Sequence, residues 1–174
     1  MRKVFTTDAV VLNKKPLLNN NLLLTLLTKK MGKINVFAFG IRKITSRRLS
    51  YFQVGNLLKT VIEKKDDRFF LKEVSLISAF SLIKEDKKKW PYFFQYFYIL
   101  NKILPENIKE EKNFFLTLDF LINLSKKEND FDRLNYYLNK LLKNLGYIEK
   151  EQKIAANLKT IEEIIEEKLP NFSL

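Results

Sequence analysis

The first eighty residues carry short apolar segments that alternate with polar residues at the two-residue period of β-strands. The segment 22–28 is rich in leucine, but its short length and the Lys-Lys-Met-Gly turn that follows favour a strand over a helix. Lys14-Lys15-Pro16 is expected to end the first strand, and Lys65-Asp66-Asp67 to close a hairpin. Strands are predicted at residues 3–13, 22–28, 33–39, 51–63 and 68–77. Five short strands without a long helical pattern predict a small barrel.

After Leu82 the apolar period changes to that of amphipathic helices. Pro91 suits a first helical turn, Pro105 is expected to end that helix, and Gly146 suits the position after a helix end. Helices are predicted at residues 88–104, at 107–125, from Asn129 or Asp130 to Leu145, and from Ile154 to Leu169. The expected class is therefore α+β, with a five-stranded barrel domain at 1–82 followed by an all-helical domain at 83–174.

The strand at 33–39 has two distinct faces. Ile34, Val36 and Ala38 share one face. The other face holds Lys33, Asn35, Phe37 and Phe39. The pattern leaves open which face points into the core, so the two phenylalanines are either core residues or exposed rings.

Composition removes most catalytic chemistries. The chain has no cysteine and no histidine, and its four glycines lie too far apart for a phosphate-binding loop. No catalytic residue, metal or cofactor is expected, and an enzyme such as a nuclease would need clustered carboxylates that the basic half lacks. No apolar run approaches the ~20 residues of a membrane span, and the N-terminus lacks the features of a secretory signal, so a cytoplasmic protein is expected.

Charge divides the chain into two unequal halves. Residues 1–80 hold 16 Lys and Arg against 5 Asp and Glu, a net charge of +11, whereas residues 81–174 hold 16 against 15. A one-signed field favours a polyanionic partner, and nucleic acid is the preferred one. An anionic membrane surface, an acidic protein and a lysine-rich composition are the alternatives.

Binding of single strands needs cations along the phosphates and flat side chains for the bases. The predicted DNA-binding residues are Lys14, Lys15, Lys29, Lys30, Lys33, Phe37, Phe39, Arg42, Lys43, Arg47 and Arg48. A second predicted site, an apolar groove beside lysines for an acidic–hydrophobic peptide, comprises Lys87, Lys88, Lys89, Trp90 and Phe94.

Three stretches resemble the RecO family of recombinational repair mediators: LLLTLLTKKMGKINVFAFGIRKITSRR, FQVGNLLKTVIEKKDDRFFLKEVSLI and LNYYLNKLLKNLGYIEK. In the first, the matching positions are Thr28, Gly32, Ala38, Gly40, Arg42, Lys43 and Ser46. The resemblance implies an oligonucleotide-binding (OB) barrel followed by helices. It also implies binding of single- and double-stranded DNA, strand annealing, and cooperation with a RecR-type clamp and the tail of single-stranded-DNA-binding protein.

The chain departs from that family at three places. Many members carry a four-cysteine zinc module soon after Leu-Gly-Tyr, but no cysteine follows Tyr147, which puts clamp and partner binding in question. Asn19 to Asn21 stand where acidic residues are frequent, and Phe39 stands where lysine is usual. The preferred function is a non-catalytic DNA-annealing mediator, and the alternative is an RNA-binding OB-fold protein, for instance one associated with ribosomes.

Overall fold

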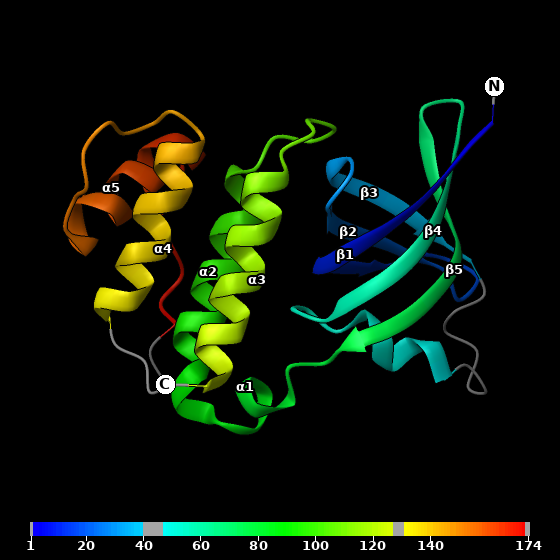
Figure 1. Ribbon diagram of the computed structural model, residues 1–174, viewed down its shortest axis with the longest axis horizontal. Coiled ribbons are helices and arrows are strands. Elements are labelled where there is room, and N and C mark those ends of the chain that lie inside the picture. The colour runs from blue at the N-terminus through cyan, green and yellow to red at the C-terminus, as the bar shows by residue number, and fades with distance from the viewer. Residues whose placement is uncertain (1, 40–46, 127–130, 173–174) are drawn as a thin grey trace. The chain divides into compact units, whose positions relative to one another are not determined.

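The five strands close into a barrel in a computed structural model that describes residues 2–39, 47–126 and 131–172 (Figure 1). The strands are β1 (Lys3–Pro16), β2 (Leu22–Thr28), β3 (Gly32–Ala38), β4 (Leu57–Lys65) and β5 (Arg68–Ser78). Their order around the barrel is β1-β2-β3-β5-β4. β3 and β5 pair in parallel and the other neighbours are antiparallel. This order and closure are those of an OB barrel, so the predicted five-stranded barrel is confirmed.

The barrel core is built from the inward side of each strand. Ile34, Val36 and Ala38 are fully buried, which settles the open question about β3: they face the core. Asp66 and Asp67 join β4 to β5 as a two-residue turn with φ of 48° and 60°, the left-handed pattern that matches the twist of a hairpin.

Two boundaries in the barrel differ from the sequence-based prediction. β1 does not end before Lys14 but continues to Pro16, because Lys14 and Lys15 still pair with the start of β2. The segment predicted to begin a strand at residue 51 instead belongs to a 3-10 helix, η1 (Arg47–Phe52), and β4 begins only at Leu57. The Asn56 side chain donates to the carbonyls of Ser50 and Tyr51 at 3.2 and 2.8 Å, which satisfies the end of η1 in place of a strand partner.

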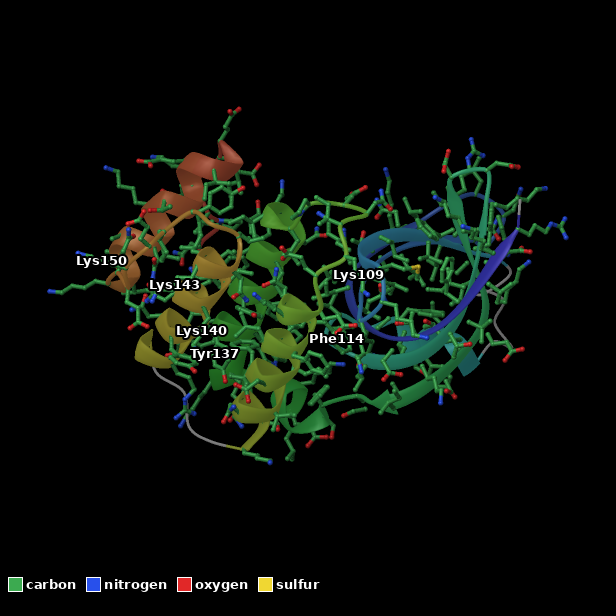
Figure 2. All side chains as sticks on the ribbon, turned by 45° about the horizontal axis from the view of Figure 1, so that its top comes forward. Lys109, Phe114, Tyr137, Lys140, Lys143 and Lys150 are labelled. Carbon is green, nitrogen blue, oxygen red and sulfur yellow. The ribbon has the colours of Figure 1, made fainter. Side chains whose placement is uncertain are left out.

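The remaining chain is helical, as predicted. Its elements are α1 (Ser81–Glu85), η2 (Lys87–Lys89), α2 (Trp90–Ile103), α3 (Glu111–Lys126), α4 (Phe131–Asn144) and α5 (Ile154–Ile165). Tyr96 stacks on Phe120 at 3.9 Å between ring centroids and meets the edge of Tyr137, which Figure 2 labels on α4. The predicted helix at 107–125 begins only at Glu111, and the last helix ends at Ile165 instead of Leu169.

Buried asparagines hold α4 to α5. The Asn139 side chain donates to the Gln152 carbonyl and accepts from the Gln152 amide, at 2.9 and 2.8 Å. Fully buried Asn157 on α5 donates to the Asn135 side chain on α4 at 2.7 Å. Because buried polar groups are costly when unpaired, this network fixes how the connection runs.

The chain forms two compact units, 1–79 with 105–114, and 80–104 with 115–174. The segment 105–110 belongs with the barrel because it bonds to β3: the Asn107 amide donates to the Lys33 carbonyl at 2.8 Å, and the Asn35 side chain donates to Glu106 at 2.9 Å. The division between residues 82 and 83 stays a prediction, and no pattern in the sequence indicates that a segment inside the helical half returns to the barrel.

Candidate nucleic-acid interface

Three phenylalanines form a cluster on the outer face of the barrel. Since the even-numbered residues of β3 fill the core, Phe37 and Phe39 face outward, and Phe70 of β5 joins them. The ring centroids lie 6.3 Å apart for Phe37–Phe39, 5.8 Å for Phe37–Phe70 and 5.9 Å for Phe39–Phe70, with interplanar angles of 11°, 29° and 20°. We call Phe37, Phe39 and Phe70 the aromatic triad.

Strand register brings the triad together. In the parallel pairing, Val36 lies opposite Phe69 and Phe37 opposite Phe70, so Phe69 points into the core and Phe70 outward. Phe70 was not among the predicted site residues. The alternation within Arg68-Phe69-Phe70 predicts that one ring faces the core and the next faces solvent. Only the β3–β5 pairing reveals that the solvent-facing ring, Phe70, contacts Phe37.

The triad leaves an apolar surface open to solvent. Phe39 is 58% exposed, and Phe37 and Phe70 are half-buried. Rings that lie nearly parallel and partly exposed offer the π faces on which bases stack. This face of the barrel therefore carries flat, partly exposed rings of the kind that base stacking requires.

The negative charge of the carboxylate beside the triad is balanced by nearby cations. Glu63 on β4 lies opposite Phe70, and its oxygens lie 2.8 Å from the Lys72 ammonium and 3.9 Å from the Arg2 guanidinium. The hydrogen bond from Lys72, together with the nearby positive charges, holds the pKa of Glu63 below its ordinary value. The Glu63 carboxylate therefore forms local ion pairs, which would reduce its repulsion of a phosphate backbone.

The structure separates the predicted lysines into two groups. Lys15 pairs with Leu23, and Leu23 with Phe37, so exposed Lys14 and Lys15 lie at the triad end of β3. Lys29 and Lys30 lie in the β2–β3 turn, at the other end of the same strand. Seven residues of strand span about 20 Å, so the two groups would contact different parts of a bound strand.

Lys33 has a different environment from the other lysines. Its exposed fraction is only 7%, and burial lowers the pKa of its ammonium, an effect that nearby Glu106 partly offsets. Arg42 and Lys43 fall outside the described residues, as do the side chains of Arg47 and Arg48. Their part in binding stays a prediction from the sequence.

The predicted peptide site lies where η2 meets α2. Lys87 and Lys88 are exposed, while the Lys89 ammonium donates to the Ser125 carbonyl at 3.2 Å. The Trp90 indole donates to the Lys84 carbonyl at 3.1 Å, and its ring meets the edge of Phe94. Phe94 is 44% exposed, and the two exposed lysines precede α2 in the chain.

The described residues contain no group of three or more His, Cys, Asp or Glu side chains placed to hold a metal ion. Among the helices in the same ranges, none has both the length and the apolar character of a membrane span.

Strand order, closure and the exposed aromatic face define the first unit as an oligonucleotide-binding-type barrel. The family model described as Recombination protein O N terminal matches residues 1–80. The barrel of this chain is therefore similar to the N-terminal region of the RecO family.

Curated relatives extend the similarity into the helical unit. The chain is 28% identical over 150 residues to the DNA repair protein RecO of Thermodesulfovibrio yellowstonii, an alignment that covers 83% of this chain and 58% of that protein. It is 26% identical over 147 residues to the DNA repair protein RecO of a Thermoanaerobacter species, covering 84% and 59%. The protein of the same name from Chlorobaculum parvum is 29% identical over 151 residues, covering 83% and 56%. The chain thus spans less than three fifths of the length of these relatives.

Proposed function

We propose that this protein binds single- and double-stranded DNA through its barrel and anneals complementary strands in recombinational repair, in the cytoplasm and without catalysing a chemical step. The observation that carries the proposal is the outward aromatic triad on a barrel whose first 80 residues have a net charge of +11. The similarity of residues 1–80 to the RecO N-terminal model, and of most of the chain to DNA repair proteins named RecO, supports a DNA repair role. The RNA-binding alternative is not favoured, since these relatives are DNA repair proteins.

Annealing follows from simple electrostatics. Two strands repel each other through their phosphates, and a basic surface that holds both reduces that repulsion. Stacking on a ring engages the face of a base and leaves its pairing edge open. No hydrolysis is needed for either effect, so the pairing of strands would proceed without ATP.

The test is a strand-annealing assay with complementary fluorescent oligonucleotides and no nucleotide triphosphate. We expect the protein to accelerate pairing, most strongly at intermediate protein concentration, because excess protein coats each strand separately. The acceleration should fade as salt rises, because screening weakens both the attraction and the repulsion. Tight binding of single strands without acceleration at any salt concentration would rule out annealing.

For partners, we propose that the acidic–hydrophobic tail of single-stranded-DNA-binding protein docks beside Lys87, Lys88, Trp90 and Phe94, and that a RecR-type clamp is a further partner. The exposed side chain of Phe94 and the two exposed lysines that precede α2 support the tail as a ligand, because they offer both apolar contact and positive charge. Titration of a synthetic tail peptide should shift the backbone amide resonances of residues 84–104. If those resonances do not move, the peptide site is elsewhere or absent.

A further inference from the structure

A pocket of about 510 Å³ lies at the end of the barrel where the β2–β3 turn approaches the β4–β5 hairpin. Four segments enclose it: the start of β1, the turn into β3, the β4–β5 hairpin and the segment before α3. Its lining residues are Phe5, Lys30, Met31, Ile34, Lys64, Asp67, Phe69, Asn107 and Lys109. It is distinct from the aromatic triad, whose rings lie on the outer face of the barrel, with Phe37 and Phe39 toward the other end of β3.

The floor and the rim of this pocket differ in character. Ile34 and Phe69 are buried core residues, and Phe5 and Met31 are half-buried, so the floor is apolar. The rim carries three lysines and one acid. Asp67 is already paired with Lys64 at 3.1 Å. Within the described part of the chain, Lys30 and Lys109 make no ion pair, so the rim keeps two uncompensated cations.

The segment that supplies Asn107 and Lys109, the latter labelled in Figure 2, is fixed to the barrel. Besides the bonds of Asn107 and Glu106 to β3, Glu106 forms a parallel β-bridge with Lys33. The backbone of Ile108 lies against Gly32 so closely that a Cβ at that position would collide with the Ile108 carbonyl. The side chains of Asn107 and Lys109 therefore extend from a backbone that is already ordered, which lowers the entropy cost of ligand binding.

We propose that this pocket binds a nucleoside 5′-phosphate, either free or at the end of a DNA strand. The base and sugar would cover the apolar floor, and the phosphate would lie between Lys30 and Lys109. Asp67 and Asn107 offer an acceptor and a donor for polar edges of the ligand. The volume of about 510 Å³ is in the range of small-ligand sites.

Isothermal titration calorimetry on the full chain tests the proposal with three probes: adenosine 5′-monophosphate, adenosine and inorganic phosphate. We expect the monophosphate to bind at least about tenfold more tightly than either fragment, because only it uses both floor and rim. The double variant Lys30→Ala/Lys109→Ala should lose about tenfold or more in affinity. The matched control is Lys59→Ala/Lys112→Ala, which removes the same charge from exposed positions outside the lining and should change affinity less than about twofold.

Backbone amide shifts give a second measurement, and Met31, Asn107 and Lys109 should move on titration with the monophosphate. If inorganic phosphate binds as tightly as the monophosphate, the pocket is a simple anion site and the proposal is wrong. If both double variants lose the same affinity, the binding is nonspecific attraction to positive charge. Shifts confined to the triad would place the nucleotide there instead.

Comparing a trinucleotide with and without its 5′-phosphate separates the two sources of the ligand, since tighter binding of the phosphorylated form identifies strand ends. Phe39→Ala should leave monophosphate binding intact, so failure of this site is distinguishable from failure of strand binding at the triad.

Discussion

The sharpest test of the triad is the single substitution Phe39→Ala. Phe39 is the most exposed of the three rings and carries no charge, so its removal separates stacking from electrostatics. The other two rings remain stacked at 5.8 Å, which keeps the rest of the face in place.

The structure allows the size of the effect to be worked out. Stacking of one base on an aromatic side chain contributes about 1–3 kcal/mol. Phe39 shares part of its surface with Phe37 and Phe70, so we take the lower part of that range, about 1–2 kcal/mol, which corresponds to a loss of about 5–30-fold in affinity. Full burial of a phenylalanine contributes about 1.5–3 kcal/mol to folding, so a ring that is 58% exposed should cost about 1 kcal/mol or less when truncated.

The assay is fluorescence anisotropy of a labelled oligothymidine at several salt concentrations, with urea unfolding as the measure of stability. Phe39→Ala should weaken binding at every salt concentration and leave the slope of log affinity against log salt unchanged, because it removes no cation from the phosphate path. Ile77→Ala is the control, since it truncates an exposed apolar residue of β5 outside the triad.

Two results would refute the reasoning. Affinity within about twofold of the parent protein would mean that no base stacks on Phe39. A flattened salt slope would mean that the substitution disturbed the cationic surface and that the loss is not one of stacking.

The remaining predictions concern the four predicted DNA-binding residues between positions 42 and 48 and two structural contacts. Replacing these four basic residues with alanine should weaken DNA binding and flatten the salt slope by about 0.7 for each single-strand phosphate that the variant leaves without a cation. An unchanged slope in the anisotropy assay would remove these residues from the site. These residues are Arg42, Lys43, Arg47 and Arg48. In urea unfolding, Gly32→Ala should lower the unfolding free energy by about 2 kcal/mol or more, because φ is +71° and the Ile108 carbonyl blocks the new Cβ. Gly146→Ala should lower it by only about 1 kcal/mol, because φ is +78° but the space around the new Cβ is open. Asn157→Ala should cost about 1–3 kcal/mol in thermal unfolding, since it removes a buried amide and its 2.7 Å hydrogen bond to half-buried Asn135 on α4. A loss below about 0.5 kcal/mol would show that water replaces the amide.

Sequence periodicity predicted the barrel well because each strand buries one side. It failed at residues 51–56, where Tyr51 and Phe52 resemble the start of a strand but belong to η1, and where the Asn56 side chain satisfies the backbone in place of a strand partner. Propensity does not reveal such a side-chain cap. Periodicity also placed the start of α3 too early, because the bonds of Glu106 and Asn107 to β3 are tertiary contacts that compete with helix formation.

The candidate site was predicted only in part, and for a similar reason. The rings of Phe37 and Phe39 follow from alternation within one strand, but their exposure depends on which face the whole barrel buries. Phe70 is 31 residues further along the chain than Phe39, and its place in the triad depends on the parallel β3–β5 register. Lys33 was predicted to bind DNA from the same strand face as Phe37 and Phe39, yet the segment 105–110 pairs with its backbone, and its side chain is buried.

A surface on which rings contact bases and cations contact phosphates suits the proposed annealing function better than long-lived binding of single strands. Stacking on a few rings holds the faces of some bases, whereas sequence readout would occupy the edges that must pair with the second strand. In the proposed function, cations spread from Lys15 at one end of the barrel to Lys30 at the other would reduce phosphate repulsion over a long path without fixing any one nucleotide. Such a surface gains affinity from salt-dependent contacts that break one at a time, so a newly formed duplex can leave as its stacked bases turn toward each other. Adding a fourth ring beside the triad, as in Leu23→Phe opposite Phe37, should therefore tighten single-strand binding and slow release of the paired product. Faster annealing with faster release in that variant would contradict this account, and a stopped-flow assay that follows binding and pairing with separate fluorophores would distinguish the two outcomes.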